Sequence, residues 1–524
     1  NLDDVVMDDP RANILWIDDE IEHLKPHILF LEEKGYSISI SNNGKEGIDK
    51  SKNSHFDLVL LDQFMPGVDG METLREIKNN NPAIPIIMIT KSEEEWLMDE
   101  AISEKIAHLL IKPVNPSQIF MACKQVLEDS SIRIEKVTSG YLKEFQQTES
   151  DADSANSVSE WWNIYNRLVK WQIDFEEQKE ASLIQILNEQ FLSCNRNFTK
   201  FVESEYVNWL SDKQRPILSP DIFKTKIKPI LENDDKVCFV VIDAMRLDHF
   251  MELYSIMAED FLIDIDSSIS ILPTATPFAR NSIFSGLFPD TFCKKYPKQL
   301  EAMSLDKGSL NNMEGDFLRD QLIHYQLSQK SLHYYKIWYV EEGKKFLSKI
   351  REYLNNDLIA IVVNFVDQLA HRRSESDILK EMVPNESGYR LAVKIWYENS
   401  WLRETLSKLA DSGYKVIITS DHGSVMVNRG AIVAADKNSS SGTRYKYGRN
   451  INVSNKSAID ARDLDLYRLP KIGHQTNYLF AKEDFFFLYP NEQNKYKERL
   501  NNSFQHGGVS MEEMLIPIFT MTPK

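Results

Sequence analysis

Cysteine is scarce in this sequence, which has only four in 524 residues. The four are scattered and share no C-x-x-C spacing, which argues against a thiolate metal site. Such cysteines are typical of a reducing compartment, where disulfides do not persist. They are Cys123, Cys194, Cys238 and Cys293.

Positive charge is also in short supply. The chain has 61 lysines and arginines against 79 aspartates and glutamates, which gives a formal net charge of −18. An acidic surface does not attract polyanions as a whole, so any contact with nucleic acid must come from a local basic patch. We also find no helix-turn-helix or basic helix pattern after residue 127, which disfavours direct DNA binding. A salt-titrated binding assay on promoter fragments would test that function.

Long apolar runs are missing. The longest, near Val237–Met245 and Leu358–Val366, fall far short of the roughly 20 residues that a membrane-spanning helix needs. The first residues, NLDDVVMDDPR, are acidic and contain no signal-peptide hydrophobic region. We therefore expect a cytoplasmic protein without membrane insertion.

The chain is long enough for two to four domains, and its composition is that of ordinary globular proteins. Residues 11–127 alternate short apolar runs with helical patterns, which predicts a doubly wound parallel sheet flanked by helices. Residues 128–213 repeat helical spacing and predict a helical bundle that links two domains. Strands and helices alternate again over residues 214–524, so the expected fold class is α/β multidomain.

One polar stretch interrupts the helical region. Residues 146–160, QQTESDADSANSVSE, are expected to form a loop. The helix that follows is expected to begin with an N-cap near Ser159.

Polar residues follow the apolar strands of residues 11–127 at the points where the strands end. In an open parallel sheet these ends converge on one functional crevice. Clustered carboxylates there can bind a hard cation such as Mg²⁺, and one of them can be a nucleophile that accepts a phosphoryl group. The residues are Asp18, Asp19, Asp62, Thr90 and Lys112.

Each of these residues has an expected role. Asp62 is the expected phosphoacceptor, and Asp18, Asp19 and Asp62 are the expected Mg²⁺ ligands. Lys112 is expected to contact the phosphoryl oxygens or the aspartate. Thr90 can donate a hydrogen bond to the new phosphoryl group and so bias a loop between two states.

This ordered set, together with MPGVDG after Asp62, resembles the CheY-like receiver family over essentially the whole length of that domain. The resemblance implies the receiver fold and phosphorylation on Asp62. One position departs from the family. Leu109 stands three residues before Lys112, where an aromatic switch residue is usual.

The C-terminal part contains a dispersed set of Asp and His residues. Asp367 and His371 are spaced i, i+4, so one helical turn would place both on one face. Oxygen and nitrogen ligands without cysteine suit Zn²⁺ or Mn²⁺. Six such positions are enough for two metals with open coordination sites, which can clamp a phosphoryl group. The six are Asp243, Asp367, His371, Asp421, His422 and His506.

Two threonines lie in LPTATPFARNSIFSG, where a turn is expected to lead into a helix. A threonine hydroxyl at a helix N-terminus can ionise against a metal and attack phosphorus. The candidates are Thr274 and Thr276. Arg280 and Asn281 in the same segment could donate hydrogen bonds to phosphoryl oxygens.

The order Asp, Thr, Asp-x-x-x-His, Asp-His, His-Gly-Gly resembles the alkaline phosphatase superfamily. VIDAMR, LPTATPFARN, TSDHG and HGGVSMEEMLIP resemble its PglZ branch, over about residues 216–524. The resemblance implies an α/β alkaline-phosphatase-like domain with two zinc ions. The implied ligands are Asp367, His371 and His506 for one ion, and Asp243, Thr276, Asp421 and His422 for the other.

The threonine loop is also similar, in length and threonine placement, to that of the nucleotide pyrophosphatase/phosphodiesterase branch. That similarity implies that Thr276 is the nucleophile, with Thr274 as runner-up. It also favours diesters over monoesters as substrates, by analogy.

Two insertions are candidates for substrate contacts. Leu287–Tyr353 is rich in aromatic residues and lysine, and Asp436–Asn450 is locally basic with interleaved tyrosines. Basic and aromatic residues near a phosphate site could hold a nucleotide by charge and stacking. A solvated flexible loop is an equally good interpretation of either segment.

The whole arrangement resembles the PorX-type family of response regulators. That resemblance implies a sensor histidine kinase as partner, a link to type IX secretion, and a homodimer formed on phosphorylation. Our leading hypothesis is a phosphorylation-controlled, zinc-dependent phosphodiesterase acting on a nucleotide or oligonucleotide. The alternative is a non-catalytic, metal-bound effector that signals by binding a sigma factor or a secretion component.

Overall fold

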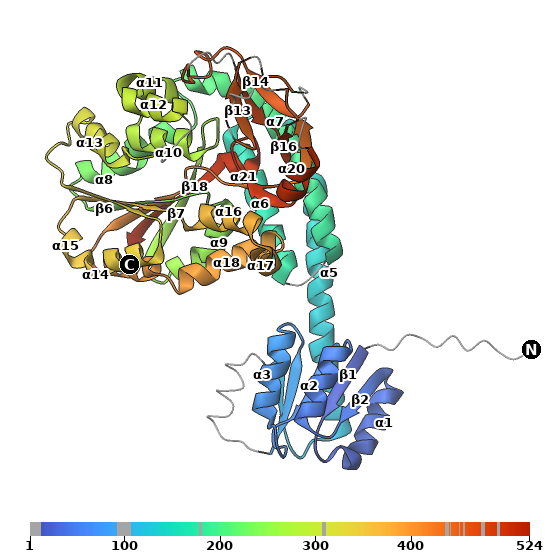
Figure 1. The fold of residues 1–524 in the computed structure, drawn as a ribbon. Coiled ribbons are helices and arrows are strands. Elements are labelled where there is room, and N and C mark those ends of the chain that lie inside the picture. Colours follow the sequence, from blue (N-terminus) through green and yellow to red (C-terminus); the bar gives the residue numbers. More distant parts are fainter. Residues whose placement is uncertain are drawn as a thin grey trace, which may run out of the picture. The chain divides into compact units, whose positions relative to one another are not determined.

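The computed structural model of the chain describes residues 12–91, 106–177, 181–305, 311–434, 440, 442–449, 451–453, 456–472, 477–489 and 493–524. The chain forms two compact units, Asn1–Glu144 and Phe145–Lys524. Figure 1 colours both along the sequence. The domain boundaries expected after residues 127 and 213 stay predictions.

The first unit is built on a parallel sheet with strand order β2-β1-β3-β4-β5. Its strands are β1 (Ala12–Ile17), β2 (Tyr36–Ser41), β3 (Leu58–Asp62), β4 (Ile86–Thr90) and β5 (His108–Ile111). Its helices are α1 (Lys25–Glu33), α2 (Gly44–Asn53), α3 (Gly70–Asn80), the start of α5 (Pro116–Ser154) and a short 3₁₀ helix, η1 (Ile21–Leu24).

Alternating side chains of these strands enter two separate cores. Leu15 and Leu61 lie in the core on one face, and Trp16 and Leu60 lie in the core on the other. Leu109, where an aromatic switch residue is usual, packs against the first core. A sheet buried on both faces needs apolar residues at nearly every strand position, and this confirms the predicted doubly wound receiver fold.

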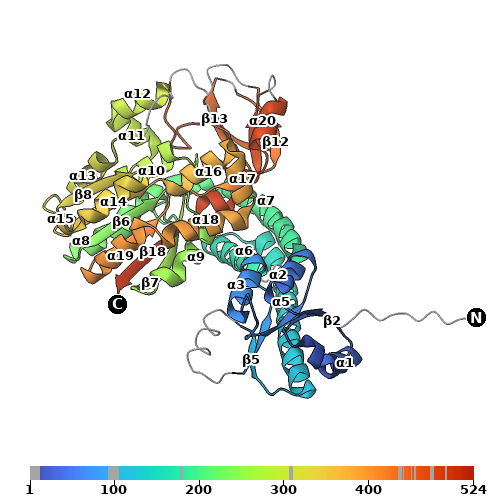
Figure 2. The same ribbon diagram turned by 60° about the horizontal axis from the view of Figure 1, so that its bottom comes forward.

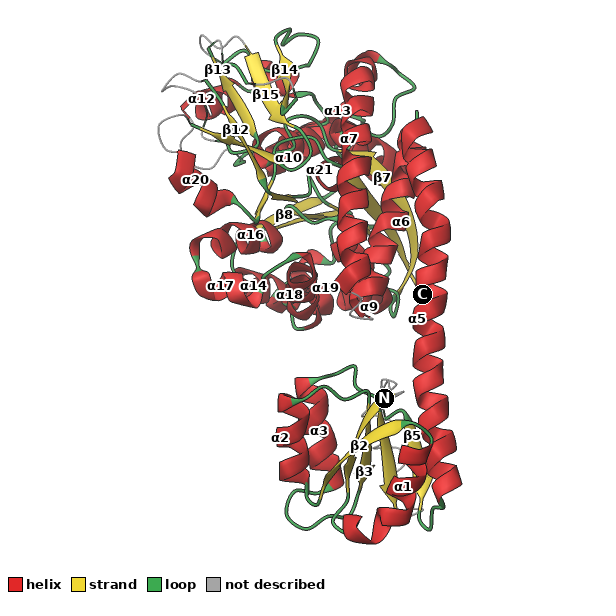
Figure 3. Ribbon diagram, turned by 90° about the vertical axis from the view of Figure 1, so that its right-hand side faces the viewer, coloured by secondary structure: helices red, strands yellow, loops and turns green. Residues whose placement is uncertain are grey.

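Long helices follow the receiver, as predicted. The second unit begins within α5 and continues with α6 (Val158–Glu177) and α7 (Ala181–Ser211). Figure 3 shows α6 and α7 side by side. Trp161 of α6 packs against Phe198 and Phe201 of α7, with ring centroids 5.4 and 6.0 Å apart.

The loop predicted over residues 146–160 is wrong for most of its length, because α5 continues to Ser154. The polar side chains that suggested a loop pair with polar side chains of α6 and α7. Asp151 forms an ion pair with Arg167 at 2.9 Å, and Asn197 donates to Asp153 at 2.8 Å. The N-cap of α6 is Ser157, two residues before Ser159, and its hydroxyl accepts the Glu160 N–H.

The second unit contains a six-stranded sheet with strand order β7-β18-β10-β6-β9-β8. Strands β8, β9, β6 and β10 are parallel, and β18 is antiparallel to both of its neighbours. The strands are β6 (Val237–Ile242), β7 (Phe261–Ile269), β8 (Leu332–Ile337), β9 (Leu358–Val363), β10 (Lys415–Thr419) and β18 (Leu515–Pro523). Thus β18, which follows every other strand in the sequence, lies inside the sheet.

Helices accompany this sheet, as Figure 2 shows. They are η2 (Ser219–Asp221), η3 (Phe223–Ile227), α8 (Lys228–Glu232), α9 (Leu247–Met257), α10 (Thr276–Ser285), α11 (Pro289–Lys295), α12 (Pro297–Leu305), α13 (Glu314–His324), α14 (Val340–Ser348), α15 (Ile350–Tyr353), α16 (Phe365–Glu375), α17 (Asp377–Met382), α18 (Glu386–Glu398), α19 (Trp401–Asp411), α20 (Gln493–Leu500) and α21 (Met511–Met514). Among the described residues, no helix has both the length and the apolar character needed to cross a membrane.

Three small sheets complete the unit. β11 (Val425–Val427) pairs with β17 (Ser503–Gln505), and β12 (Arg429–Ile432) pairs with β16 (Phe485–Leu488). β15 (Asn477–Ala481) lies between β13 (Tyr445–Gly448) and β14 (Ala458–Ala461).

The six-stranded sheet is also buried on both faces. In β6, Cys238 and Val240 enter one core while Val237 and Phe239 enter the other. The predicted α/β architecture of this domain is confirmed. The carboxyl ends of the parallel strands β6, β9 and β10 share one edge of the sheet, and that edge holds the residues described next.

Candidate metal-binding active site

The first unit gathers acidic residues at one edge of its sheet. Asp18 follows β1 and Asp62 ends β3, and with Asp19 they place one carboxylate oxygen each within 4.8 Å of one another. Asp18 and Asp62 are buried, whereas Asp19 is exposed. Three carboxylates at this separation repel one another unless a cation lies between them, so the arrangement suits a hard cation.

Lys112 supplies the positive charge nearest to this group. Its Nζ lies 2.7 Å from Asp62 Oδ1 and 3.0 Å from Asp18 Oδ2. Burial raises the pKa of Asp62, and the hydrogen bond from Lys112 opposes that shift. Thr90, the last residue of β4, donates its hydroxyl proton to the side chain of Gln63, which directly follows Asp62.

The second unit has a similar meeting of strand ends. Asp243 follows β6, Asp421 and His422 follow β10, and one ligand atom of each lies within 4.8 Å of the others. All three residues are buried. Thr276 is the first residue of α10, and its Oγ1 lies 3.1 Å from His422 Nε2 and 3.3 Å from Asp243 Oδ1. The threonine hydroxyl therefore belongs to this cluster.

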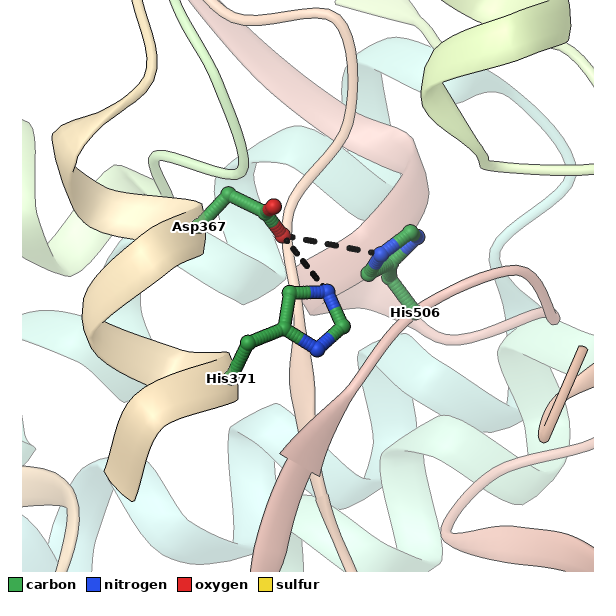
Figure 4. Close-up of side chains that lie close together, drawn as sticks. All are labelled: Asp367, His371 and His506. Carbon is green, nitrogen blue, oxygen red and sulfur yellow. Dashed lines mark ion pairs between the residues drawn. The ribbon is translucent and has the colours of Figure 1, made fainter. Parts of the chain in front are cut away.

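An adjoining cluster consists of Asp367, His371 and His506, shown in Figure 4. Asp367 and His371 lie one turn apart on α16, and His506 follows β17. Asp367 Oδ1 is 3.3 Å from His371 Nε2 and 3.6 Å from His506 Nε2. The rings of His422 and His506 stack with their centroids 4.2 Å apart, so the two clusters are neighbours.

Both clusters fit a divalent metal. Asp367 Oδ1 and Asp421 Oδ2 are buried, and among the described residues neither accepts a hydrogen bond. A carboxylate oxygen buried in this way is costly unless a cation compensates it. Imidazole nitrogens and carboxylates aimed at the same point are the ligand set of zinc and similar ions.

The histidines near Asp367 differ in basicity. The ion pair with Asp367, at 3.3 Å, raises the pKa of His371 to about 9. Burial lowers the pKa of His506 to about 3. His506 is therefore neutral at physiological pH, which is the form of imidazole that binds a metal. Burial, together with the charge of Asp421, raises the pKa of Asp243.

Arg280, on α10, is buried against the carboxylate of Asp243. Its Nη1 donates to Asp243 Oδ2 at 2.7 Å and to Asn364 Oδ1 at 3.0 Å. Its Nε donates to Glu314 Oε1 at 2.7 Å. These bonds give Arg280 the geometry of a residue that orients Asp243, and its predicted contact with phosphoryl oxygens stays a prediction.

Thr274 and Thr276 differ in their surroundings. Thr274 Oγ1 donates to Gly508 O at 2.8 Å and accepts the Gly507 N–H at 3.1 Å. Its carbonyl oxygen lies 3.2 Å from His506 Nδ1. Of the two threonines, only Thr276 places its hydroxyl in the cluster, and Thr274 supports the His506 loop.

Asn281 braces helix α10. Its Nδ2 donates to Pro277 O at 2.9 Å, and its Oδ1 accepts from Asn311 Nδ2 at 2.9 Å. Asn311 Nδ2 also lies 3.1 Å from Thr276 O. These contacts place Asn281 behind the nucleophile loop, and its contact with a phosphoryl group stays a prediction.

Sequence reasoning missed three residues of this site. Asn364 directly follows β9, so the strand-end rule that found Asp243 could also have found it. Glu314 and Asn311 lie in the aromatic insertion, where no motif points to Arg280 or α10. Their roles depend on contacts between segments that are far apart in the chain.

Part of the positive charge of the basic insertion, Asp436–Asn450, is buried. Residues 435–439, 441 and 450 lie outside the described residues. Of the rest, Arg444 and Lys446 are buried. Arg444 pairs with Glu513 at 2.6 Å, and Lys446 donates to Tyr489 Oη at 2.8 Å. These two cations stabilise the domain interior.

A cavity of about 180 Å³ lies between helices α6 and α7 and the loops after β6 and β10. Glu512, at α21, lines it together with Arg246, Asp248 and Glu386. Burial raises the pKa of Glu512 to about 7, and the hydrogen bond from Asn195 and the charge of Arg246 only partly oppose the shift.

This shift predicts a pH-dependent stability. Because the folded pKa of Glu512 exceeds its ordinary value of 4.5, the folded state holds the proton more tightly, and stability falls as pH rises from about 4.5 to about 7. Glu512→Gln cannot titrate and should lose this dependence. Denaturant unfolding of both proteins across this window should show the variant gaining stability relative to the parent as pH rises. A constant difference would contradict the prediction.

Comparison with known families covers most of the chain. Residues 14–141 match the response regulator receiver domain, and residues 131–210 match the PorX response regulator linker domain. Residues 222–521, more than half of the chain, match the BREX system PglZ alkaline phosphatase-like domain. The chain belongs to the PorX-type response regulators and carries a PglZ domain. Alkaline phosphatase-like domains bind metals, which agrees with the two clusters.

Other relatives of this PorX-type regulator match its receiver region. Transcriptional regulatory protein ZraR of Klebsiella oxytoca is 33% identical over 132 residues, which are 25% of this chain and 30% of ZraR. Transcriptional regulatory protein ResD of Bacillus subtilis (strain 168) is 35% identical over 121 residues, 23% of this chain and 50% of ResD. The chain thus spans at most half the length of these two relatives.

Solved receiver structures give matches of the same extent. A CheY-like receiver domain protein from Methanospirillum hungatei JF-1 is 28% identical, with 22% of this chain and 94% of that chain covered and a TM-score of 0.22. A two-component response regulator from Clostridium difficile is 30% identical, with 22% and 97% covered and a TM-score of 0.22.

Proposed function

We propose that this PorX-type response regulator is a zinc-dependent phosphodiesterase with Thr276 as its nucleophile. The observation that carries the proposal is the position of the Thr276 hydroxyl, within 3.3 Å of both His422 Nε2 and Asp243 Oδ1. A hydroxyl in a cluster of buried metal-ligand types, at the start of a helix, has the surroundings of an activated nucleophile.

Each group of residues in the site has its own proposed role. Two zinc ions held by the Asp and His clusters would lower the pKa of a hydroxyl and offset charge on a phosphoryl group. Thr276 attacks phosphorus and displaces the leaving oxygen, and hydrolysis of the resulting threonine ester restores the hydroxyl. Arg280 orients Asp243 through the 2.7 Å hydrogen bond, and its charge opposes the rise in the pKa of Asp243.

The proposed substrate is a nucleotide or an oligonucleotide. A cavity of about 280 Å³ opens where β8 and β9 end, and Trp338 and Tyr339 line it. Their side chains are 42% and 60% exposed, and Lys336 Nζ lies 5.4 Å from the Trp338 ring centroid. Exposed aromatic rings with a nearby cation are suited to stacking on a base.

We propose that the receiver controls this activity. Asp62 would accept a phosphoryl group from a sensor histidine kinase, with Mg²⁺ on Asp18, Asp19 and Asp62 and with Lys112 against the phosphoryl oxygens. Thr90 would turn its hydroxyl from Gln63 to the new phosphoryl group. By similarity to the PorX-type family, the regulated process is type IX secretion, and phosphorylation favours a homodimer.

The decisive experiment is turnover of a phosphodiester panel with and without acetyl phosphate. The panel contains bis(p-nitrophenyl) phosphate and linear and cyclic dinucleotides. Zinc-loaded protein should hydrolyse at least one diester, and acetyl phosphate should change its rate or its oligomeric state. Asp62→Ala should keep the basal rate and lose the response. Absence of hydrolysis of every diester would overturn the proposal.

A second candidate function is non-catalytic signalling through a sigma factor or a secretion component. The observation in its favour is an apolar surface on α17 and α18, where Ile378, Met382, Leu391 and Ile395 are all more than half exposed. Exposed apolar patches are typical of protein interaction sites. Full signalling by a Thr276→Ala variant in cells would support this function over the first.

Metal removal is predicted to destabilise the PglZ domain, because the buried carboxylates of Asp367 and Asp421 would lose the positive charge of the ion and keep only side-chain partners such as His371. A metal present at about 1,000 times its dissociation constant stabilises the folded state by about 4 kcal/mol. Calorimetry with zinc and with excess chelator should therefore show a lower Tm in chelator. Asp367→Asn should shrink the difference and reduce bound zinc from two ions to one. Equal Tm values in both conditions would refute the metal site.

A further inference from the structure

Helix α21 (Met511–Met514) lies between a linker helix and the two loops that end in metal-ligand histidines. On the side of the site, Glu513 is fully buried and contacts both loops. Its Oε1 accepts the Gly508 N–H at 2.9 Å, two residues after His506. Its carbonyl oxygen accepts the Gly423 N–H at 3.2 Å, directly after His422.

This contact is close as well as hydrogen-bonded. A Cβ added at Gly423 would lie 1.8 Å from the carbonyl oxygen of Glu512. Real Cβ atoms do not approach an oxygen so closely, so α21 packs directly on the His422 loop. Arg444 holds Glu513 from behind with two hydrogen bonds of 2.8 and 2.6 Å, which compensate the buried charge. Any shift of α21 must therefore move the loop.

On the opposite side, Asn195 of linker helix α7 forms hydrogen bonds with α21. Its Oδ1 accepts the Met511 N–H at 2.8 Å, and its Nδ2 lies 3.0 and 3.2 Å from the two carboxylate oxygens of Glu512. Asn195 is only 3% exposed. One side-chain amide thus bonds the backbone and a side chain of α21 together.

We propose that Asn195 is a positioning residue for His422 and His506, acting through α21. The chain of contacts runs from Asn195 to Met511 and Glu512, and from Glu513 to the two histidine loops. Metal ligands must be held within about 0.5 Å of their productive geometry. The linker helix therefore affects how tightly the site binds zinc, because it positions the two histidines. The inference rests on the proposed function only in taking the two histidines as metal ligands.

The test is Asn195→Asp, which places a new carboxylate against Glu512 while keeping an acceptor for the Met511 N–H. Above the raised pKa of Glu512, about 7, both carboxylates are ionised. There the repulsion should displace α21 and weaken zinc affinity of the full chain by about tenfold or more, the range for residues that orient metal ligands. Asn197→Asp is the matched control. Asn197 lies on the same helix and donates to a carboxylate at the same kind of distance, 2.8 Å, but its partner is Asp153 on α5.

A second substitution separates positioning from general damage. Adding Glu512→Gln to Asn195→Asp restores an amide–carboxylate pair with the roles exchanged, and it should recover zinc affinity to within about threefold. Should Asn195→Asp unfold, Asn195→Ala takes its place, with a smaller loss in the same direction. Zinc affinity is measured by competition with a chromophoric chelator, and kcat and KM are measured on the best diester.

The outcomes are distinct. Weak zinc binding in Asn195→Asp, parental binding in Asn197→Asp, and recovery in the double variant support the proposal. Parental zinc affinity in folded Asn195→Asp and Asn195→Ala overturns it, as does an equal loss in Asn197→Asp. If the parent protein binds zinc but hydrolyses no diester, the phosphodiesterase proposal fails, and the zinc affinities still decide the role of Asn195.

Discussion

Thr276→Ala is expected to lower kcat for diester hydrolysis on the order of 10⁴-fold or more, because loss of a nucleophile leaves only binding and charge stabilisation. Zinc affinity should change far less, since Asp243, Asp421 and His422 remain in place. Steady-state kinetics on one diester, together with a zinc titration, would measure both quantities. A large loss of activity with little loss of metal distinguishes a nucleophile from a residue that only supports the site.

Two variants act as controls for this prediction. Thr276→Ser keeps a hydroxyl and should retain a measurable part of the activity. Thr274→Val removes a hydroxyl whose partners are Gly507 and Gly508, outside the cluster, and should cost less than Thr276→Ala. Full activity in Thr276→Ala would rule out attack by this threonine.

Arg280→Met is expected to reduce the free energy of unfolding by about 3–5 kcal/mol in metal-free protein, the usual cost of leaving a buried charge without its partner. Arg280 is buried between Asp243 and Glu314, and both carboxylates are themselves buried. Methionine fills similar space but donates no hydrogen bond. Denaturant unfolding in the presence of a chelator measures the loss, and zinc should restore part of it by compensating Asp243.

Arg319→Met supplies the matched comparison. Arg319 lies on α13, the helix that begins with Glu314, and pairs with Asp316 at 2.8 Å on the exposed surface. An exposed pair contributes about 1 kcal/mol or less, so this variant should unfold almost like the parent. Similar losses in the two variants would mean that burial of the Arg280 network has no special energetic weight.

The fold could be predicted from the sequence wherever burial dictates the residue pattern. Strands such as Leu58–Asp62 and Val237–Ile242 are apolar at nearly every position because both faces of their sheets are covered. Residues 146–154 were predicted as a loop but are helical. Polarity alone does not separate a loop from a helix whose polar side chains pair with other helices. Asp151 forms an ion pair with Arg167 of α6, and Asp153 accepts a hydrogen bond from Asn197 of α7.

Part of the site could also be predicted from the sequence. Asp243, Asp421 and His422 could be predicted because parallel strand ends converge by geometry alone. The resemblance already favours Thr276 over Thr274, and the structure adds that their hydrogen bonds differ. The identity of the nucleophile stays a prediction. Glu314, a partner of Arg280, could not be predicted, since it lies in an insertion where no motif points to Arg280.

The place of β18 in its sheet has a consequence for synthesis. The strand pairs with β10 on one side and β7 on the other, although it follows both in the sequence by about a hundred residues or more. A ribosome therefore releases β7 and β10 long before the strand that joins them, and such late, non-local pairing is slow. The five strands of the receiver, by contrast, are complete by Ile111. During translation, the receiver can fold while the PglZ domain still lacks the strand that joins β7 to β10.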